Sequence, residues 1–150
     1  MKSGRSIFSR RLRLALKESA SEVQEEARRT HNFKSDTSTL ERSVKTKVSA
    51  EYYADVYLNE HMAEYGPYVH QGTKPHRIMF KRKKALRFLK GGRFIFAKSV
   101  HHPGTKADPF LYEALKNSRR EINRIFKQYT ENSLEEVANA LRRKSYTFRG

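Results

Sequence analysis

The sequence has no cysteine and no long apolar run. Without cysteine the chain can form neither a disulfide framework nor a thiolate metal site, and this absence suits a reducing cytoplasm. The longest apolar run near the basic amino terminus, Leu14–Leu16, is far shorter than a signal-peptide core. No run approaches the roughly 18 residues that a membrane span needs. We therefore expect a soluble protein without a membrane partner.

Acidic residues are missing from the middle of the chain. Between Tyr65 and Ala107 there are eleven Lys and Arg residues and not one Asp or Glu. A folded surface normally mixes both signs of charge, so this segment indicates an anionic partner or neighbour. The formal net charge of +16 points the same way, without distinguishing nucleic acid from acidic protein or lipid.

The length of 150 residues suits a single domain, which we assign to 1–150. Only 37% of the residues are apolar and 32% are charged, which is polar for a self-sufficient globule. Either the helices are long and partly solvated, or the chain is a subunit that completes its burial against neighbours.

The first segment, 1–31, is expected to be a long helix. Its apolar residues, from Phe8 to Val23, recur at three- and four-residue steps and form one stripe. Cations crowd its first half and glutamates its second, which opposes the helix dipole. A solvated basic face is the simpler interpretation, but the arrangement also fits a basic end that meets something acidic.

The middle segment, 40–107, is expected to hold the strands. Alternation over Val44–Val48 and Tyr52–Leu58 predicts one hairpin, and residues around Gly66-Pro67 predict a short helix or turn. Phe88 and Phe94 flank the glycine turn at 91–92, which predicts a second, basic hairpin. The resulting fold class is α+β, with antiparallel strands between two long helices in the order of the chain.

The last segment, 108–144, is expected to be helical and broken, with a tail at 145–150. Asp108 is a good N-cap, and Pro109 suits the first helical position. Leu134 and Leu141 fall well round the cylinder from the apolar face that begins at Phe110. Ser133 followed by Glu136 resembles a capping box, so we expect a break near Asn132 and a second helix able to dock on a neighbouring subunit.

Two near-repeats bracket the acid-free segment, Val69–His76 and Val100–Lys106, and each contains Gly-Thr-Lys. A phosphate-binding loop needs a longer glycine-rich frame than either of them offers. We therefore interpret Gly72 and Gly104 as structural residues that supply positive-φ turns.

Catalysis finds little support in the sequence. Mg²⁺-dependent nucleases need clustered carboxylates, which the basic segment lacks. Histidines could supply a zinc site, but none has helical ligand spacing, and adjacent His101 and His102 would point opposite ways on a strand. We predict no enzyme, no catalytic or metal residue and no cofactor, and place a metal-dependent nuclease third among the alternatives.

Nucleic-acid binding has more support, because Lys and Arg interleave with phenylalanines that could stack on bases. Those aromatics have strand spacing, however, and are more often core residues. No known nucleic-acid module matches the pattern, so only non-specific phosphate contact is expected.

An ordered set of short segments carries a family resemblance over about half of the chain. The segments are Leu40–Val44, Ala63–Thr73, Lys84–Phe88, Phe94–Val100 and His102–Leu111. In order and spacing they resemble the small minor tail or neck proteins of long-tailed double-stranded-DNA phages, also called tail-completion or head–tail joining proteins. Residues 131–150 are longer than the minimal family pattern.

The resemblance implies an α+β subunit with a curved antiparallel sheet of about four to six strands. It also implies a structural virion protein that forms a sixfold or twelvefold homo-oligomeric ring where tail meets head. Such a ring would contact portal or adaptor proteins and tail-tube proteins, and double-stranded DNA would pass through its channel. The expected location is the virion neck, and the host cytoplasm during assembly. The alternative from another class is a free basic nucleic-acid-binding protein.

Ten cations are the candidate contacts to partner protein or DNA. They are Arg10, Arg11, Arg13, Lys74, Arg77, Lys81, Arg82, Lys83, Arg93 and Lys106. Since a strongly basic lumen would retard passing DNA, we expect acidic protein neighbours for most of the basic segment.

Overall fold

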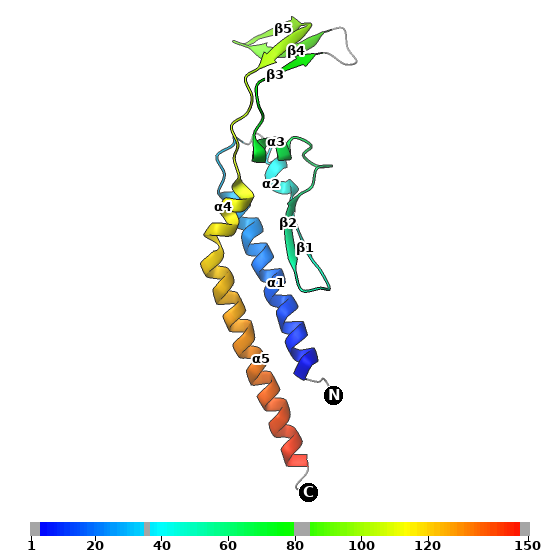
Figure 1. Cartoon of the computed structure of the whole chain (residues 1–150), viewed down its shortest axis with the longest axis vertical. Coiled ribbons are helices and arrows are strands. Elements are labelled where there is room, and N and C mark those ends of the chain that lie inside the picture. The colour runs from blue at the N-terminus through cyan, green and yellow to red at the C-terminus, as the bar shows by residue number, and fades with distance from the viewer. Residues whose placement is uncertain (1–3, 35–36, 80–84, 148–150) are drawn as a thin grey trace.

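The computed structural model describes residues 4–34, 37–79 and 85–147. Two long antiparallel helices, α1 (Gly4–Arg29) and α5 (Arg119–Thr147), form a stem, and both termini lie at its lower end (Figure 1). A β-hairpin lies beside α1, and a ribbon of strands projects from the opposite end of the stem. The α+β class with a long helix at each end is thus confirmed.

Small side chains on α1 allow the helices of the stem to approach closely. Ala15, Ser19 and Ala20 are all buried along the same helix as Ile7 and Val23. On α5, Ile125 and Ser133 are the matching fully buried residues. The predicted helix at 1–31 is therefore confirmed, although Phe8, expected in the apolar stripe, is half exposed.

The unusual charge order of α1 is matched by its antiparallel neighbour. Arg10 and Arg11 both donate to the Glu136 carboxylate, at 2.7 and 3.0 Å. In the acidic half of α1, the Glu18 carboxylate accepts a 2.7 Å hydrogen bond from the Tyr129 hydroxyl. The acidic group that the basic end of α1 meets therefore lies in the same chain.

This clamp makes the stem sensitive to pH. Hydrogen bonds from Arg11, together with the charges of both guanidinium groups, hold the pKa of Glu136 below its usual value of 4.5. Because the folded pKa is lowered, the stabilisation is present above pH 4.5 and is lost as the pH falls through the folded value.

We expect Glu136→Gln to lower the urea midpoint at pH 7, and the difference from the parent to vanish in the acid range. Glu135→Gln, which changes an exposed neighbour on the same helix, is the matched control. A Glu136→Gln variant that is as stable as the parent at pH 7 would contradict the assignment.

The first predicted hairpin is formed by β1 (Val44–Val48) and β2 (Ala54–Leu58), and Val44 lies opposite Leu58. It lies against α1, where the Gln24 and Arg28 side chains donate to the Val44 carbonyl at 2.6 and 3.0 Å. Its connection holds Tyr52 at a positive φ of 63°.

The core is small and lies where the stem meets the hairpin. Short helices α2 (Thr39–Ser43) and α3 (Gly66–Gln71) close this end, and α3 confirms the short helix expected near Gly66. Phe110, at the start of α4 (Phe110–Asn117), packs with Val23, Leu40, Val44 and Ala63. Burial is thus concentrated at one end of the stem.

The predicted break near Asn132 is wrong. The helix is interrupted earlier, at Ser118 between α4 and α5, and then runs unbroken to Thr147, into the segment predicted as a tail. Ser133 is not a capping residue, because its buried hydroxyl donates to the Tyr129 carbonyl one turn back, at 2.6 Å. Leu134 and Leu141 do lie on a separate face, where they are 63% and 61% exposed.

The sheet is smaller than predicted. In the part of the chain that the structure describes, three separate two-stranded antiparallel ladders replace one curved sheet of four to six strands. The basic segment forms two of them, β3 (His76–Met79) with β6 (Ser99–His102) and β4 (Leu86–Lys90) with β5 (Arg93–Ala97). Its strands pair only with one another, so they cannot extend the β1–β2 hairpin.

Candidate functional site

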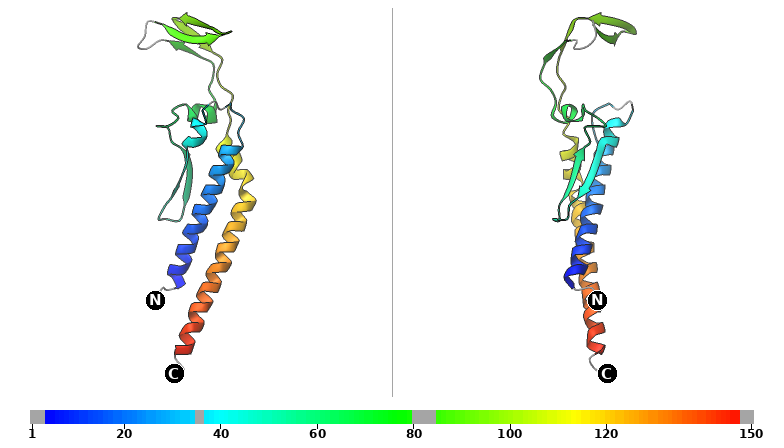
Figure 2. Two further views of the ribbon diagram at one scale, coloured as in Figure 1. Left: turned by 180° about the vertical axis from the view of Figure 1, so that it is seen from behind. Right: turned by 90° about the vertical axis from the view of Figure 1, so that its right-hand side faces the viewer.

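The ribbon that projects from the stem, residues 73–79 and 85–105, is the candidate site, and we call it the arm (Figures 1 and 2). Six cations of the acid-free segment lie on these residues, and Lys106 lies directly below them. The four described strands of the arm are mostly exposed, and every residue of β3 is exposed.

The basic hairpin predicted around Gly91 and Gly92 is confirmed, and both glycines have positive φ. The sequence predicted that it would share one sheet with the β1–β2 hairpin, but the two form separate ladders. The strands of the arm stand clear of the helices, and none of their described residues is buried (Figure 2).

One face of the β4–β5 hairpin is apolar and uncovered. In the observed register Leu89 lies opposite Phe94, and Arg87 lies opposite Phe96, so all four side chains share a face. Leu89, Phe94 and Phe96 are 63%, 61% and 66% exposed. The Arg87 guanidinium lies 4.7 Å from the centre of the Phe94 ring, a cation–π contact. We call these four residues the arm face.

The two near-repeats meet at the base of the arm. Thr73 and Thr105 pair antiparallel, each donating its backbone N–H to the other's carbonyl at 2.8 and 3.1 Å. The positive-φ prediction for Gly72 and Gly104 is confirmed, with φ of 74° and 92°. A Cβ on Gly104 would lie 2.3 Å from the Thr73 carbonyl oxygen, so this close crossing requires glycine.

Asp108 fastens the arm base to the core, and the N-cap predicted for it is wrong. Its buried carboxylate accepts the backbone N–H groups of Asn32 and Phe33, at 2.7 and 2.9 Å. Its own N–H donates to the Val69 carbonyl at 3.0 Å. Pro109 was predicted as the first helical residue, but it is the N-cap, and α4 begins one position later, at Phe110. The helix α4 has no side-chain cap.

The predicted contact cations fall into two groups. Lys74, Arg77, Arg93 and Lys106 are exposed on the arm or at its base, with Arg77 donating to the Ser99 hydroxyl at 2.8 Å. The other predicted contact cations that the structure describes lie in the N-terminal half of α1, the half farther from the arm (Figure 1). They are Arg10 and Arg11, which pair with Glu136, and Arg13, whose guanidinium lies 5.5 Å from the Tyr52 ring. Lys81, Arg82 and Lys83 lie outside the described residues.

Sequence reasoning missed the arm face. The alternation of apolar and basic residues correctly predicted strands, but Phe94 and Phe96 were interpreted as core residues. No local signal separates a covered strand face from an uncovered one, because both alternate with period two.

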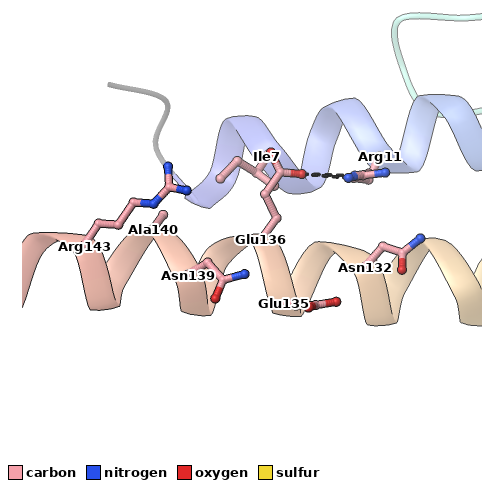
Figure 3. Close-up of a pocket in the computed structure, with 8 residues that line it drawn as sticks. All are labelled: Ile7, Arg11, Asn132, Glu135, Glu136, Asn139, Ala140 and Arg143. Carbon is pink, nitrogen blue, oxygen red and sulfur yellow. Dashed lines mark hydrogen bonds and ion pairs between the residues drawn. The ribbon is translucent and has the colours of Figure 1, made fainter.

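Several hollows lie on the described part of the stem, including an open groove between the long helices and a smaller hollow beside β2. An open groove of about 710 Å³ runs between the N-terminal half of α1 and the C-terminal half of α5, with the Arg11–Glu136 pair inside it (Figure 3). A hollow of about 250 Å³ beside the β2 strand is lined by His70, Leu111 and Tyr112. There burial lowers the pKa of His70, partly offset by the charge of Asp108. Neither hollow brings a nucleophile and a base together.

Within residues 4–34, 37–79 and 85–147, no group of three or more His, Asp or Glu side chains could hold a metal ion. His76 and His102 stack across β3 and β6 with ring centres 5.1 Å apart, without a carboxylate partner among the described contacts. In the same part of the chain no helix is long and apolar enough to cross a membrane.

Protein-family models, curated proteins and solved structures were compared with the chain, and none matches it. The arm, its charge and its uncovered apolar face are the features of the molecule that bear on its function.

Proposed function

We propose that the protein is a structural component of the neck of a long-tailed double-stranded-DNA phage. It would be a ring-forming subunit that completes the tail and joins it to the head, leaving a channel for DNA. The observation that carries this proposal is the arm face, three large apolar side chains that are 61–66% exposed on a ribbon standing away from the core. Exposed apolar patches of this kind mark interaction sites.

The shape of the subunit supports ring formation, because the arm at one end and the stem at the other offer unlike surfaces to neighbouring copies. Contact between unlike surfaces of neighbouring copies is heterologous, and it closes into a ring when the rotation permits. The resemblance to neck proteins favours six or twelve copies, with portal or adaptor proteins and tail-tube proteins above and below.

The direct test is incorporation into particles. In a phage that encodes this chain, an epitope-tagged copy is expected to sediment with intact virions and to remain there after a high-salt wash. Particles assembled without the protein should have separate heads and tails. Intact, infectious particles that lack the protein would contradict the proposal.

The second candidate, a free basic nucleic-acid-binding protein, is favoured by one observation. The arm presents its cations beside exposed Phe94 and Phe96, a combination that can contact phosphates and stack on unpaired bases. For this candidate, an isolated monomer should bind duplex DNA with an affinity that falls steeply with salt concentration. An oligomer whose assembly survives nuclease treatment would favour the neck protein.

A further inference from the structure

We propose that the arm face of one copy docks on an acidic, tyrosine-bearing surface of a second copy of this chain. That surface, the loop patch, comprises Glu60, Met62, Glu64, Tyr65 and Tyr68, which connect β2 to α3 and form the first turn of α3. The inference deepens the proposed ring, because it names the two surfaces that meet between neighbours.

The chemistry of the arm face defines its occupant. Leu89, Phe94 and Phe96 require an apolar or aromatic surface that can cover them. Arg87 shares their face, whereas Lys90 and Arg93 pair at the tip of the hairpin and belong to its opposite face by register. Since the acid-free segment supplies no counter-charge, the carboxylates must come from the partner.

The loop patch has both properties. Met62, Tyr65 and Tyr68 are 42%, 48% and 63% exposed. Glu60 and Glu64 are exposed beside them, and neither carboxylate takes part in a hydrogen bond or ion pair with the described residues. Several other carboxylates are already neutralised within the chain, as Glu121 is by Arg124 and Glu136 by Arg11.

A second tyrosine surface has the wrong charge. The outer face of the β1–β2 hairpin carries Tyr53 and Tyr57, which are 49% and 43% exposed. In the observed register, however, Lys45 and Lys47 share this face with a single carboxylate, that of Asp55. A cationic arm would be repelled there, so charge favours the loop patch over this surface.

The contact joins separate copies, because within one chain both surfaces are uncovered. The β4–β5 hairpin lies at the far end of the arm, whereas α3 lies near the arm base, at the top of the stem (Figure 1). A neighbour displaced around a ring axis can place its loop patch against this hairpin, and its own arm is then free to repeat the contact. The interface is heterologous, as a ring requires.

The lack of native cysteine allows a clean cross-linking test. Phe94→Cys and Tyr65→Cys are prepared as separate proteins, mixed and oxidised gently. We expect a disulfide-linked dimer on a non-reducing gel only when both variants are present. Phe94→Cys mixed with Tyr53→Cys is the matched control, and equal cross-linking in the control mixture would overturn the inference.

Charge exchange tests the same contact without cysteine. Glu60→Lys/Glu64→Lys and, separately, Arg87→Glu are each expected to weaken assembly about ten-fold or more, because like charges then face each other. Combining them in one chain should restore assembly. Glu51→Lys, which reverses an exposed carboxylate on the β1–β2 connection, should leave assembly unchanged, and circular dichroism confirms that each variant is folded.

The outcomes separate this inference from the proposed function. A ring that assembles without the specific cross-link and without charge rescue overturns the arm–patch contact and leaves the ring proposal standing. A chain that stays monomeric, forms no cross-link and binds duplex DNA through the arm overturns both.

Discussion

Phe110→Ala is expected to destabilise the protein by about 3–5 kcal/mol, the usual cost of removing a fully buried aromatic side chain. Phe110 is 0% exposed, and its ring meets Phe33 at 5.2 Å and His70 at 5.5 Å between ring centres. Because the core is small and concentrated at one end of the stem, little surrounding structure can collapse into the cavity.

Urea denaturation followed by circular dichroism measures this effect. Phe96→Ala is the matched control, since Phe96 is 66% exposed on the arm and should change the free energy of unfolding by no more than about 0.5 kcal/mol. Equal destabilisation by the two substitutions would show that the arm belongs to the folded core, contrary to the structure. If Phe110→Ala fails to fold, Phe110→Leu provides the milder step.

Asp108→Ala is expected to have the second-largest effect, about 1–3 kcal/mol, because it leaves two backbone N–H groups without their acceptor. Those groups belong to Asn32 and Phe33, in the connection that follows α1. Asp108 itself is 6% exposed, so water replaces its carboxylate poorly. The substitution releases the arm base from the core as well as lowering stability.

Hydrogen exchange at the Asn32 and Phe33 amides measures directly whether their hydrogen bonds to Asp108 are formed. We expect both amides to lose protection against exchange in Asp108→Ala. In Asp108→Asn their protection should lie between that of Asp108→Ala and that of the parent, because asparagine keeps one acceptor oxygen without the charge. Glu113→Ala, an exposed position on α4, is the control. Unchanged protection in Asp108→Ala would show that the carboxylate does not hold the connection.

The N-cap prediction for Asp108 shows what a local sequence pattern leaves out. An aspartate directly before Pro-Phe predicts an N-cap from sequence spacing alone, and a helix does begin at Phe110. The carboxylate instead bonds to a connection 76 residues earlier in the chain. A long-range hydrogen bond of this kind has no local pattern, so only the fold reveals it.

The C-terminal helix gives a similar contrast. The spacing of Leu134 and Leu141 correctly predicted a second apolar face, and both side chains are exposed. The break in the C-terminal helix was inferred from Ser133 and Glu136, yet both residues lie at the contact between α1 and α5. Ser133 is buried in it and bonds to the preceding turn, while Glu136 binds Arg10 and Arg11 across it. Tertiary contact therefore overrides a capping pattern.

The sequence by itself determined the long helices, the two hairpins with their glycine turns, and the segregation of charge into one acid-free segment. These follow from periodicity, turn chemistry and composition, which act over a few residues. Only the tertiary structure decided that the acid-free segment forms a projecting arm, that its two Gly-Thr-Lys repeats cross at the arm base, and that Phe94 and Phe96 are uncovered. Alternation specifies that a strand has an apolar face, but what covers that face depends on segments far away in the chain or on another molecule.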